Sequence, residues 1–286
     1  MNLDKFKISD GKNFKISEFK TDFTGDLDSK KEAEKRLKKN KEKMRELQDK
    51  FYAHDKFSLL IIFQAMDAAG KDSSIKHVMS GLNPQGTQVF SFKQPSKEEL
   101  DHDYLWRTSK SLPERGRIGI FNRSYYEEVL VVKVHNLVKY QNIPSELVTD
   151  NIWTERYNQI RNFEQHISQN GTVILKFFLN VSKNEQKSRF LKRLDTPSKN
   201  WKFSAADLEE RKLWDEYQKC YQQAIRETST DFAPWYIIPA DHKWFARLLI
   251  SEIINDTLEN LKIEYPSLSD EQIANLEIYK KQLIEE

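Results

Sequence analysis

The residues best suited to chemistry form a short loop of small and charged side chains at positions 67–72 (DAAGKD). An apolar run ends just before this loop, at Gln64, and a helix-like segment follows it. Backbone N–H groups at the start of a helix attract an anion, and small residues let a phosphate group approach the backbone. We therefore interpret the segment as a phosphate-binding loop. In it Lys71 reaches the transferring phosphate, and further contacts come from Ala68, Ala69, Gly70, Asp72 and Ser73.

The loop departs from the pattern G-x-x-x-x-G-K-[ST] at two positions. Ala65 stands in the place of the first glycine, and Asp72 in that of the metal-binding hydroxyl residue. A bare A-x-x-x-x-G-K also arises by chance in an ordinary strand-to-helix turn, so the interpretation depends on the strand–loop–helix context. Mg²⁺ needs oxygen ligands, and a carboxylate can replace the missing hydroxyl. Asp67 and Asp72, beside Lys71, are therefore both candidates for holding Mg²⁺.

A second polar cluster follows the apolar run that ends at Phe121. Asn122 can hold a water molecule or a phosphate oxygen, and Arg123 can make a bidentate contact to phosphate. The same stretch also fits a capped helix start, with Ser124 as the N-cap. Because the cluster is expected opposite the phosphate loop, we favour catalytic roles for Asn122 and Arg123, beside Asp67 and Lys71.

Basic side chains provide a third cluster. Arg189 and Arg193 are four residues apart and therefore share one helical face. An exposed basic face is one interpretation. The other is that these arginines close over a polyanion and stabilise charge on the transferring phosphoryl group. Lys76, just after the phosphate loop, would add to the same basic channel.

The elements that must position these residues are five short apolar runs separated by stretches long enough for helices. Near-continuous apolar strands that alternate with helices indicate a parallel sheet covered on both faces. Ligands of such sheets bind beyond the carboxyl ends of the strands, where the first two clusters lie. The expected strands are 58–64, 87–92, 117–121, 172–180 and 235–239.

We expect one domain, 1–286, with three helical additions. Residues 1–50 should form an N-terminal helical extension, whose Lys/Glu-rich part reads as a solvated surface helix. Residues 181–233 are rich in bases and poor in apolar residues, as expected of a mobile helical lid. Residues 250–286 should form two helices separated by a break at Pro266.

Composition narrows the class of protein. The net charge of the 286-residue chain is only +2, so we expect no nucleic-acid partner. One cysteine, Cys220, permits no intramolecular disulfide and fits a cytoplasmic location. No apolar run approaches the ~18 residues of a membrane span, so no membrane partner is expected. The histidines show no zinc-ligand spacing.

Four stretches in order resemble polyphosphate kinase family 2. They are AMDAAGKD, NPQGTQVFSFKQPSKEELDHDYLWR, RIGIFNRSYYEEVLVVKVH and FFLNVSKNEQKSRFLKRLDTPSKNWKFSAAD. The resemblance covers residues 30–255, approximately. It implies an α/β P-loop kinase fold like that of thymidylate kinase, with a helical lid. It also implies reversible transfer of the terminal phosphoryl group of inorganic polyphosphate to a nucleotide, with Mg²⁺.

The resemblance carries over to individual positions. Asp67 matches the family's loop aspartate, which implies that it holds Mg²⁺. Gly70 and Lys71 match the family's phosphate-binding pair, and Arg123 matches an arginine that binds phosphate. Arg189 and Arg193 fall within the lid motif. We expect nucleotide contacts from Asn122, Tyr126 and Glu127.

The residue at position 122 separates subgroups of that family. Members that act mainly on nucleoside diphosphates carry aspartate there, whereas Asn122 resembles the subgroup that phosphorylates both nucleoside mono- and diphosphates. We therefore expect AMP, ADP and ATP as partners, with guanine nucleotides as further candidates. We also expect the protein to be a homo-oligomer. An ATP-dependent nucleotide kinase of the same fold and a non-catalytic polyanion-binding protein are the alternatives.

Overall fold

The structure is a computed structural model that describes residues 1–25, 27 and 29–286. At its centre is a six-stranded sheet in the order β1-β6-β5-β2-β4-β3. The five strands from β2 to β6 are parallel to their neighbours, which confirms the expected α/β class. The strands are β1 Lys7–Ile8, β2 Ser58–Gln64, β3 Thr87–Ser91, β4 Ile118–Asn122, β5 Thr172–Asn180 and β6 Trp235–Pro239.

The sixth strand, β1, corrects the expected number of five. It pairs antiparallel with β6, with Lys7 opposite Tyr236 and Ile8 opposite Trp235. Two residues inside a polar, lysine-rich segment show neither alternation nor an apolar run, so the sequence pattern carried no signal for this strand.

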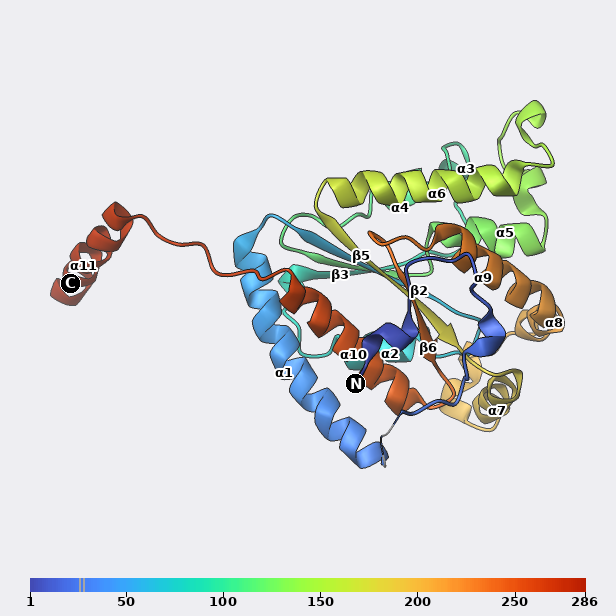
Figure 1. Ribbon diagram of the computed structural model, residues 1–286, viewed down its shortest axis with the longest axis horizontal. Helices are drawn as coiled ribbons and strands as arrows, with labels where there is room; N and C mark the ends of the chain where they lie inside the picture. The colour runs from blue at the N-terminus through green and yellow to red at the C-terminus, as the bar shows by residue number, and fades with distance from the viewer. Residues whose placement is uncertain (26, 28) are drawn as a thin grey trace.

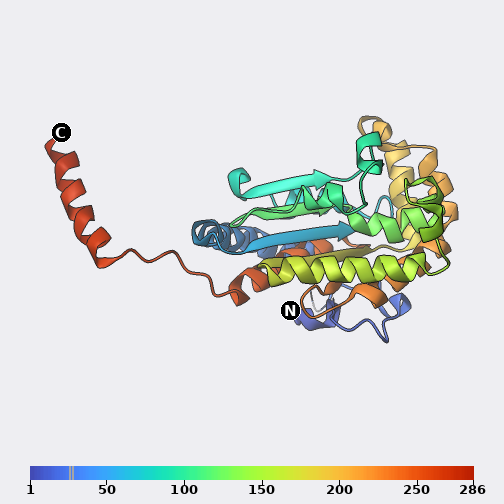
Figure 2. The same cartoon turned by 90° about the horizontal axis from the view of Figure 1, so that it is seen from above.

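Helices cover both faces of the sheet (Figure 1, Figure 2). On one side α1 packs along α10, and α10 also contacts α2. On the other side α6 packs against α9 and β5. The longer helices are α1 Lys30–His54, α2 Lys71–Val78, α6 Ile152–Gln169, α7 Lys183–Leu194, α9 Trp214–Thr228, α10 Lys243–Asn260 and α11 Asp270–Glu285.

Several short elements complete the connections. The short α-helices are α3 Lys97–Leu100, α4 Trp106–Ser109, α5 Val131–Val134 and α8 Ala206–Lys212. The 3₁₀ helices are Leu3–Phe6, Ile16–Glu18, Pro84–Gly86, Tyr125–Val129, Leu137–Tyr140, Ser145–Leu147 and Pro197–Lys202.

Local chemistry sets the ends of α1. The side chain of Ser29 accepts a hydrogen bond from the backbone N–H of Glu32, which caps the N-terminus, and Asp55 ends the helix in the left-handed conformation. Only a narrow stripe of α1, which includes Met44 and Phe51, is buried. Most of the other residues are exposed or partly exposed, and many are charged, as expected of a surface helix.

The extension expected at residues 1–50 is helical only in its second part. The described residues before α1 form short 3₁₀ helices and β1 instead. The segment 181–233 also differs from a uniformly exposed lid. Its last helix, α9, buries Tyr217, Tyr221 and Ile225 among other residues. The C-terminal segment contains the end of α10, which is largely buried, and α11, which is not.

The main cluster of buried apolar side chains draws on residues from Phe6 to Ile263. All seven residues of β2 and all five of β6 are buried, as expected for central strands covered on both faces. This packing fixes the carboxyl ends of β2 and β4, from which the candidate site extends. Among the described residues, no helix is long and apolar enough to cross a membrane.

Candidate active site

The backbone of the phosphate loop takes an unusual conformation between β2 and α2. Gly70 has φ of 110°, which suits glycine, and Ala68 has φ of 60°, which is strained for a residue with a Cβ. The turn is closed by hydrogen bonds from Ala69 N to Met66 O (3.2 Å) and from Ser74 N to Gly70 O (2.9 Å). Helix α2 starts at Lys71, so its free N–H groups open toward the loop. This is the geometry that we expected for anion binding.

Lys71 lies inside the loop rather than in solvent. Its ammonium group donates a hydrogen bond to the carbonyl oxygen of Ala65 at 2.8 Å. Burial lowers the pKa of Lys71, and the nearby carboxylate of Asp67 opposes that shift. The site therefore surrounds a desolvated cation with charged groups, and the charge of a buried group is little screened by water.

Asp67, Arg123 and Glu127 form a connected charge cluster. Arg123 donates a hydrogen bond to Asp67 at 3.1 Å and lies 3.9 Å from a carboxylate oxygen of Glu127. Burial by itself lowers the pKa of Arg123, but Glu127 and then Asp67 outweigh it, and the pKa rises. Burial raises the pKa of Glu127, against Arg123 and Lys71. Arg123 is thus charged and held between two carboxylates, beside the phosphate loop.

Asn122 is joined to the other end of the loop. Its side-chain amide donates a hydrogen bond to Asp72 at 2.8 Å. Strand β4 pairs with β2 so that Phe63 lies opposite Asn122, which places the two strand ends together. The prediction that residues after the first and third apolar runs would meet is confirmed by this geometry.

Arg189 does not take the exposed place on a lid that we expected. It lies on α7 with 7% of its surface exposed. All five of its N–H groups have acceptors within the protein. These acceptors are Glu185, the carbonyl oxygens of Ala68 and Ala69 in the phosphate loop, and the carbonyl oxygens of Ala240 and Asp241. This placement corrects the expected contact with polyphosphate, because the donors of Arg189 already bind the protein. Arg189 supports the phosphate loop from the side of α7.

Tyr126 also lies elsewhere than we expected from the sequence. It is fully buried, and its hydroxyl group bonds to Glu164, Lys176 and Thr228. A nucleotide cannot reach it, so the expected nucleotide contact is corrected. The reason is local: Tyr126 belongs to the 3₁₀ helix Tyr125–Val129, which turns it into the core while Glu127 faces the site.

The remaining basic and hydroxyl candidates lie around the loop. Lys76 is exposed on α2. The hydroxyl group of Ser73 accepts a hydrogen bond from Arg247 at 2.6 Å. Arg193 lies 3.6 Å from Asp207 and over the ring of Phe190, within the α7–α8 region. The phosphate contacts expected of Lys76, Ser73 and Arg193 stay predictions.

A small cavity of about 120 Å³ adjoins the charge cluster. Sequence reasoning missed part of its lining: Glu210, Tyr217 and Tyr221. They come from α8 and α9 rather than from a strand end, so their place depends on how those helices fold over the sheet. The four-residue spacing of Tyr217 and Tyr221, which puts both on one helical face, was the available signal.

Two basic residues of α10 were missed as well. Arg247 bonds to the loop at Ser73, and Lys243 lies one turn earlier. Partial burial, and then the charges of Arg189 and Arg247, lower the pKa of Lys243 to about 8. This helix follows β6, so its first turn joins the same edge of the sheet as the phosphate loop.

The donor set fits Mg²⁺ held together with a substrate. No cluster of three or more His, Cys, Asp or Glu side chains that could hold a metal ion occurs in the part of the chain that the structure describes. Two carboxylates of the loop can be reached from solvent: Asp67 is partly exposed and Asp72 is exposed. Mg²⁺ commonly uses one or two carboxylates together with substrate phosphates and water, rather than a complete protein cage.

The comparison with family models decides the assignment. The model described as "Polyphosphate kinase 2 (PPK2)" matches residues 27–266. The chain belongs to the polyphosphate kinase 2 family.

Named relatives of this polyphosphate kinase 2 chain agree. It is 49% identical to "ADP-polyphosphate phosphotransferase" of Rhodopseudomonas palustris over 98% of both chains. It is 44% identical to "AMP/ADP-polyphosphate phosphotransferase" of Meiothermus ruber over 92% of this chain and 96% of that one. The crystal structure of polyphosphate kinase 2 from Arthrobacter aurescens TC1 matches with a TM-score of 0.87 and 36% identity, over 96% of this chain and 95% of that one.

Proposed function

We propose that this protein transfers the terminal phosphoryl group of inorganic polyphosphate to AMP and to ADP, reversibly and with Mg²⁺. The observation that carries the proposal is the meeting of Lys71, Asp67 and Arg123 at the end of β2 and β4, where Arg123 bonds to Asp67 at 3.1 Å. The names of the two relatives support it, because one contains ADP and the other contains both AMP and ADP, together with polyphosphate.

In the proposed reaction the protein supplies position and charge rather than covalent chemistry. In-line phosphoryl transfer needs the donor and acceptor aligned and the developing charge neutralised. The N–H groups of the loop and Lys71 would bind the transferring phosphate, and Arg123 would bind it from the β4 side. Asp67 would hold Mg²⁺, which neutralises charge on the phosphate oxygens when bound. An acceptor phosphate is already ionised, so no general base is required.

The basic residues beside the loop give the proposed donor a path. Lys243 and Arg247 lie on α10 at the side where Arg247 reaches the phosphate loop. Polyphosphate is a flexible polyanion, and a line of cations would bind it. The acceptor would then approach from the opposite side, at Asn122, Glu127 and the cavity lined by Tyr217 and Tyr221.

A direct assay tests the activity. The protein is incubated with AMP, Mg²⁺ and polyphosphate, and ADP and ATP are measured by chromatography. ATP replaces polyphosphate as donor in a parallel sample, which tests the ATP-dependent nucleotide kinase. Product only with ATP, or no product with either donor, would reject the proposal. Lys71→Ala and Asp67→Ala are expected to abolish transfer, whereas Lys31→Ala, in the exposed part of α1, serves as the control.

Three further parts of the proposal go beyond the chemistry. Guanine nucleotides are tested as acceptors in the same assay. The single cysteine, Cys220, fits a reducing compartment, and we include a cytoplasmic location. We also include a homo-oligomeric state, for which the C-terminal helix offers a specific contact.

A further inference from the structure

Helix α11 projects from the body of the molecule on an extended segment. Figures 1 and 2 show it well separated from the sheet and its covering helices in both views. None of its residues is buried by any part of the chain that the structure describes. It also lies beyond residues 27–266, the segment that the family model matches. The helix therefore lies outside the kinase body, and none of its residues has a role in the proposed transfer reaction.

Four apolar side chains of α11 share one face. Steps of three and four residues align Ile273, Leu276, Tyr279 and Leu283, and all four are at least half exposed. A capping box at Ser269 and Gln272 starts the helix. An isolated helix of this length is marginally stable in water, and most helices in proteins are held by packing of an apolar face. We therefore expect the apolar face of α11 to be covered by another protein surface.

The root of this arm is fixed to α1. Ile263 is buried, Lys50 lies 3.1 Å from Glu264, and the hydroxyl group of Tyr265 donates a hydrogen bond to Asp49 at 2.6 Å. Only the residues from 266 to 269 remain between this anchor and the helix, and they include Pro266. Because this segment leads outward, the helix lies away from the body of its own chain (Figure 1).

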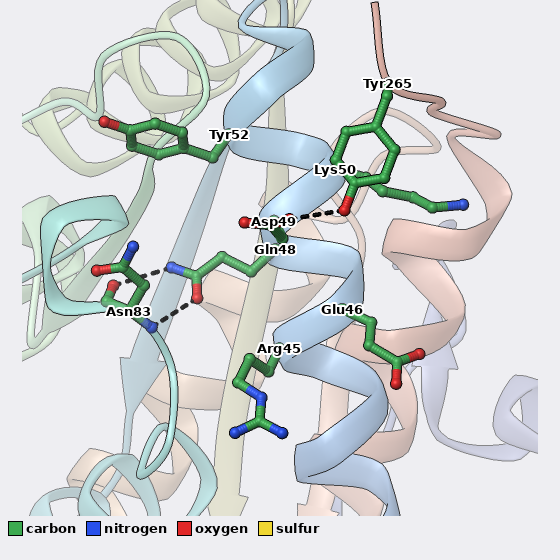
Figure 3. A pocket seen from close by; sticks show the side chains of 8 residues that line it. All are labelled: Arg45, Glu46, Gln48, Asp49, Lys50, Tyr52, Asn83 and Tyr265. Atoms are coloured by element: carbon green, nitrogen blue, oxygen red, sulfur yellow. Dashed lines mark hydrogen bonds between the residues drawn. The ribbon is translucent and has the colours of Figure 1, made fainter. Parts of the chain in front are cut away.

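A groove of about 590 Å³ lies at the same root, along the second half of α1. Figure 3 shows the side chains that line it: Arg45, Glu46, Gln48, Asp49, Lys50, Tyr52, Asn83 and Tyr265. At its floor the side chain of Gln48 bonds twice to the backbone of Asn83, at 2.8 and 3.0 Å. These polar groups are already satisfied, so an apolar face can cover them without leaving them unpaired. The rings of Tyr52 and Tyr265 and the stem of Arg45 offer apolar contact.

The net charges of the two whole helices are opposite, whereas the groove lining is balanced, with Arg45 and Lys50 against Glu46 and Asp49. Helix α1 carries ten Lys and Arg residues against five Asp and Glu residues. Helix α11 carries four Asp and Glu residues against two Lys residues. An acidic helix on a basic one gains both attraction and orientation. A second α11 would instead place two acidic helices together, so the opposite charge favours α1 as the receiving surface.

We propose that α11 of one copy docks in the α1 groove of a second copy, and that the two arms are exchanged around a two-fold axis. The apolar face around Leu276 would cover Tyr52 and Arg45 of the other chain. Each groove lies beside the root of its own arm, so a two-fold arrangement brings each arm to the other copy's groove and closes the assembly. The contact is self-complementary and leaves no arm unpaired.

Mass in solution gives the first test. Static light scattering with size-exclusion chromatography is applied to the full chain and to Leu276→Glu combined with Leu283→Glu. We expect the double variant to associate at least tenfold more weakly than the wild type. Ile278→Glu is the matched control, because Ile278 is 52% exposed, as against 51% for Leu276, but lies on the opposite face of the helix. A monomeric wild type, or a double variant as associated as the wild type, would overturn the proposal.

Cross-linking gives the second test and identifies the receiving surface. A chain with Leu276→Cys is mixed with a chain with Tyr52→Cys and treated with a short bis-maleimide. The native Cys220 is buried. We expect a two-chain product between the two variants, and much less when Ile278→Cys replaces Leu276→Cys. Products of Leu276→Cys with itself alone would show helix-to-helix pairing. A third chain carries both Leu276→Cys and Tyr52→Cys. A cross-link formed only within this chain would show docking on the same copy. Either result would contradict the exchange, and both readouts are independent of phosphoryl transfer.

Discussion

At the scale of single residues, Asn122 is the side chain on which acceptor choice is expected to depend. Its amide donates a 2.8 Å hydrogen bond to Asp72, at the end of β4 beside the phosphate loop. A neutral amide in this place adds no negative charge where, in the proposed reaction, the donor and acceptor phosphates converge. The same hydrogen bond joins the end of β4 to the first turn of α2. Asn122 therefore holds these two elements together and keeps this place uncharged.

We predict that Asn122→Asp shifts acceptor preference from AMP toward ADP by about tenfold or more. The new carboxylate would face Asp72 and the phosphates, and such an interaction in a partly buried site is worth on the order of a few kcal/mol. AMP must place its only phosphate deep in the site, whereas ADP can present its β-phosphate there. The measurement is the ratio of kcat/KM for AMP and ADP. Asn122→Ala removes the hydrogen bond without adding charge and separates the two effects. An unchanged ratio in Asn122→Asp would remove this position from the specificity argument.

Lys243 leads to a prediction about pH. Partial burial and neighbouring arginines lower its pKa to about 8, so the ammonium form is lost as pH rises through this value. If Lys243 binds polyphosphate, affinity should fall between pH 7 and pH 9. Bound polyanion favours the charged form and moves this loss to higher pH. We expect Lys243→Arg to flatten the pH profile, because arginine stays charged, and Lys243→Gln to weaken binding at pH 7. Equal profiles for wild type and Lys243→Arg would exclude Lys243 from the path.

At the scale of elements, α7 and the phosphate loop are joined by Arg189. Its guanidinium group bonds to the carbonyl oxygens of Ala68 and Ala69, while Gln186 donates to the carbonyl oxygen of Asp67 at 2.9 Å. The strained Ala68 is thus held from α7. We expected α7 to move as part of a lid. Its side chains Gln186 and Arg189 instead hold the backbone of the phosphate loop.

We predict that Arg189→Ala lowers kcat strongly but leaves the salt dependence of polyphosphate binding unchanged. A side chain whose donors are all used within the protein releases no counterions when the polyanion binds. Removing it leaves buried carbonyl oxygens unpaired, at a cost on the order of 1–3 kcal/mol each. Binding at several salt concentrations, with turnover, is the measurement, and Arg189→Lys should recover part of kcat. A flatter salt slope in Arg189→Ala would instead mean direct contact, as the sequence pattern first indicated.

The elements show where sequence reasoning succeeds and fails. The apolar runs predicted β2, β4, β5 and β6 because buried parallel strands need little but continuous apolar residues. The run at β3 was also predicted, although β3 is an edge strand with no buried residue. Residues directly after strands, such as Asp67 and Arg123, could be placed because the topology fixes strand ends. Arg189 and Tyr126 could not, because charge and helical spacing give the face that a residue occupies but not what packs against that face. The places of Glu210 and Tyr217 at the cavity depend on how α8 and α9 pack over the sheet. No local sequence pattern gives that packing.

At the scale of the whole molecule, a buried ion pair joins the sheet to the helices behind the site. Lys176 on β5 and Glu164 on α6 are both fully buried and lie 2.6 Å apart. Burial lowers the pKa of Lys176, against the attraction of Glu164. The hydroxyl groups of Tyr125 and Tyr126 also donate to Glu164, at 2.9 and 2.8 Å. The pair thus anchors the 3₁₀ helix that carries Glu127 to the site.

We predict that Lys176→Met lowers the free energy of unfolding by about 3–5 kcal/mol, because it leaves the Glu164 carboxylate buried without its cation. Adding Glu164→Gln should recover part of this loss, since a neutral amide can accept the tyrosine hydrogen bonds at a smaller desolvation cost. The two changes share one contact, so their effects should be strongly non-additive. Chemical denaturation of the two single variants and the double variant measures the coupling. Additive losses would mean that the pair acts as two independent polar groups, and that the 3₁₀ helix Tyr125–Val129 is held by its apolar packing instead.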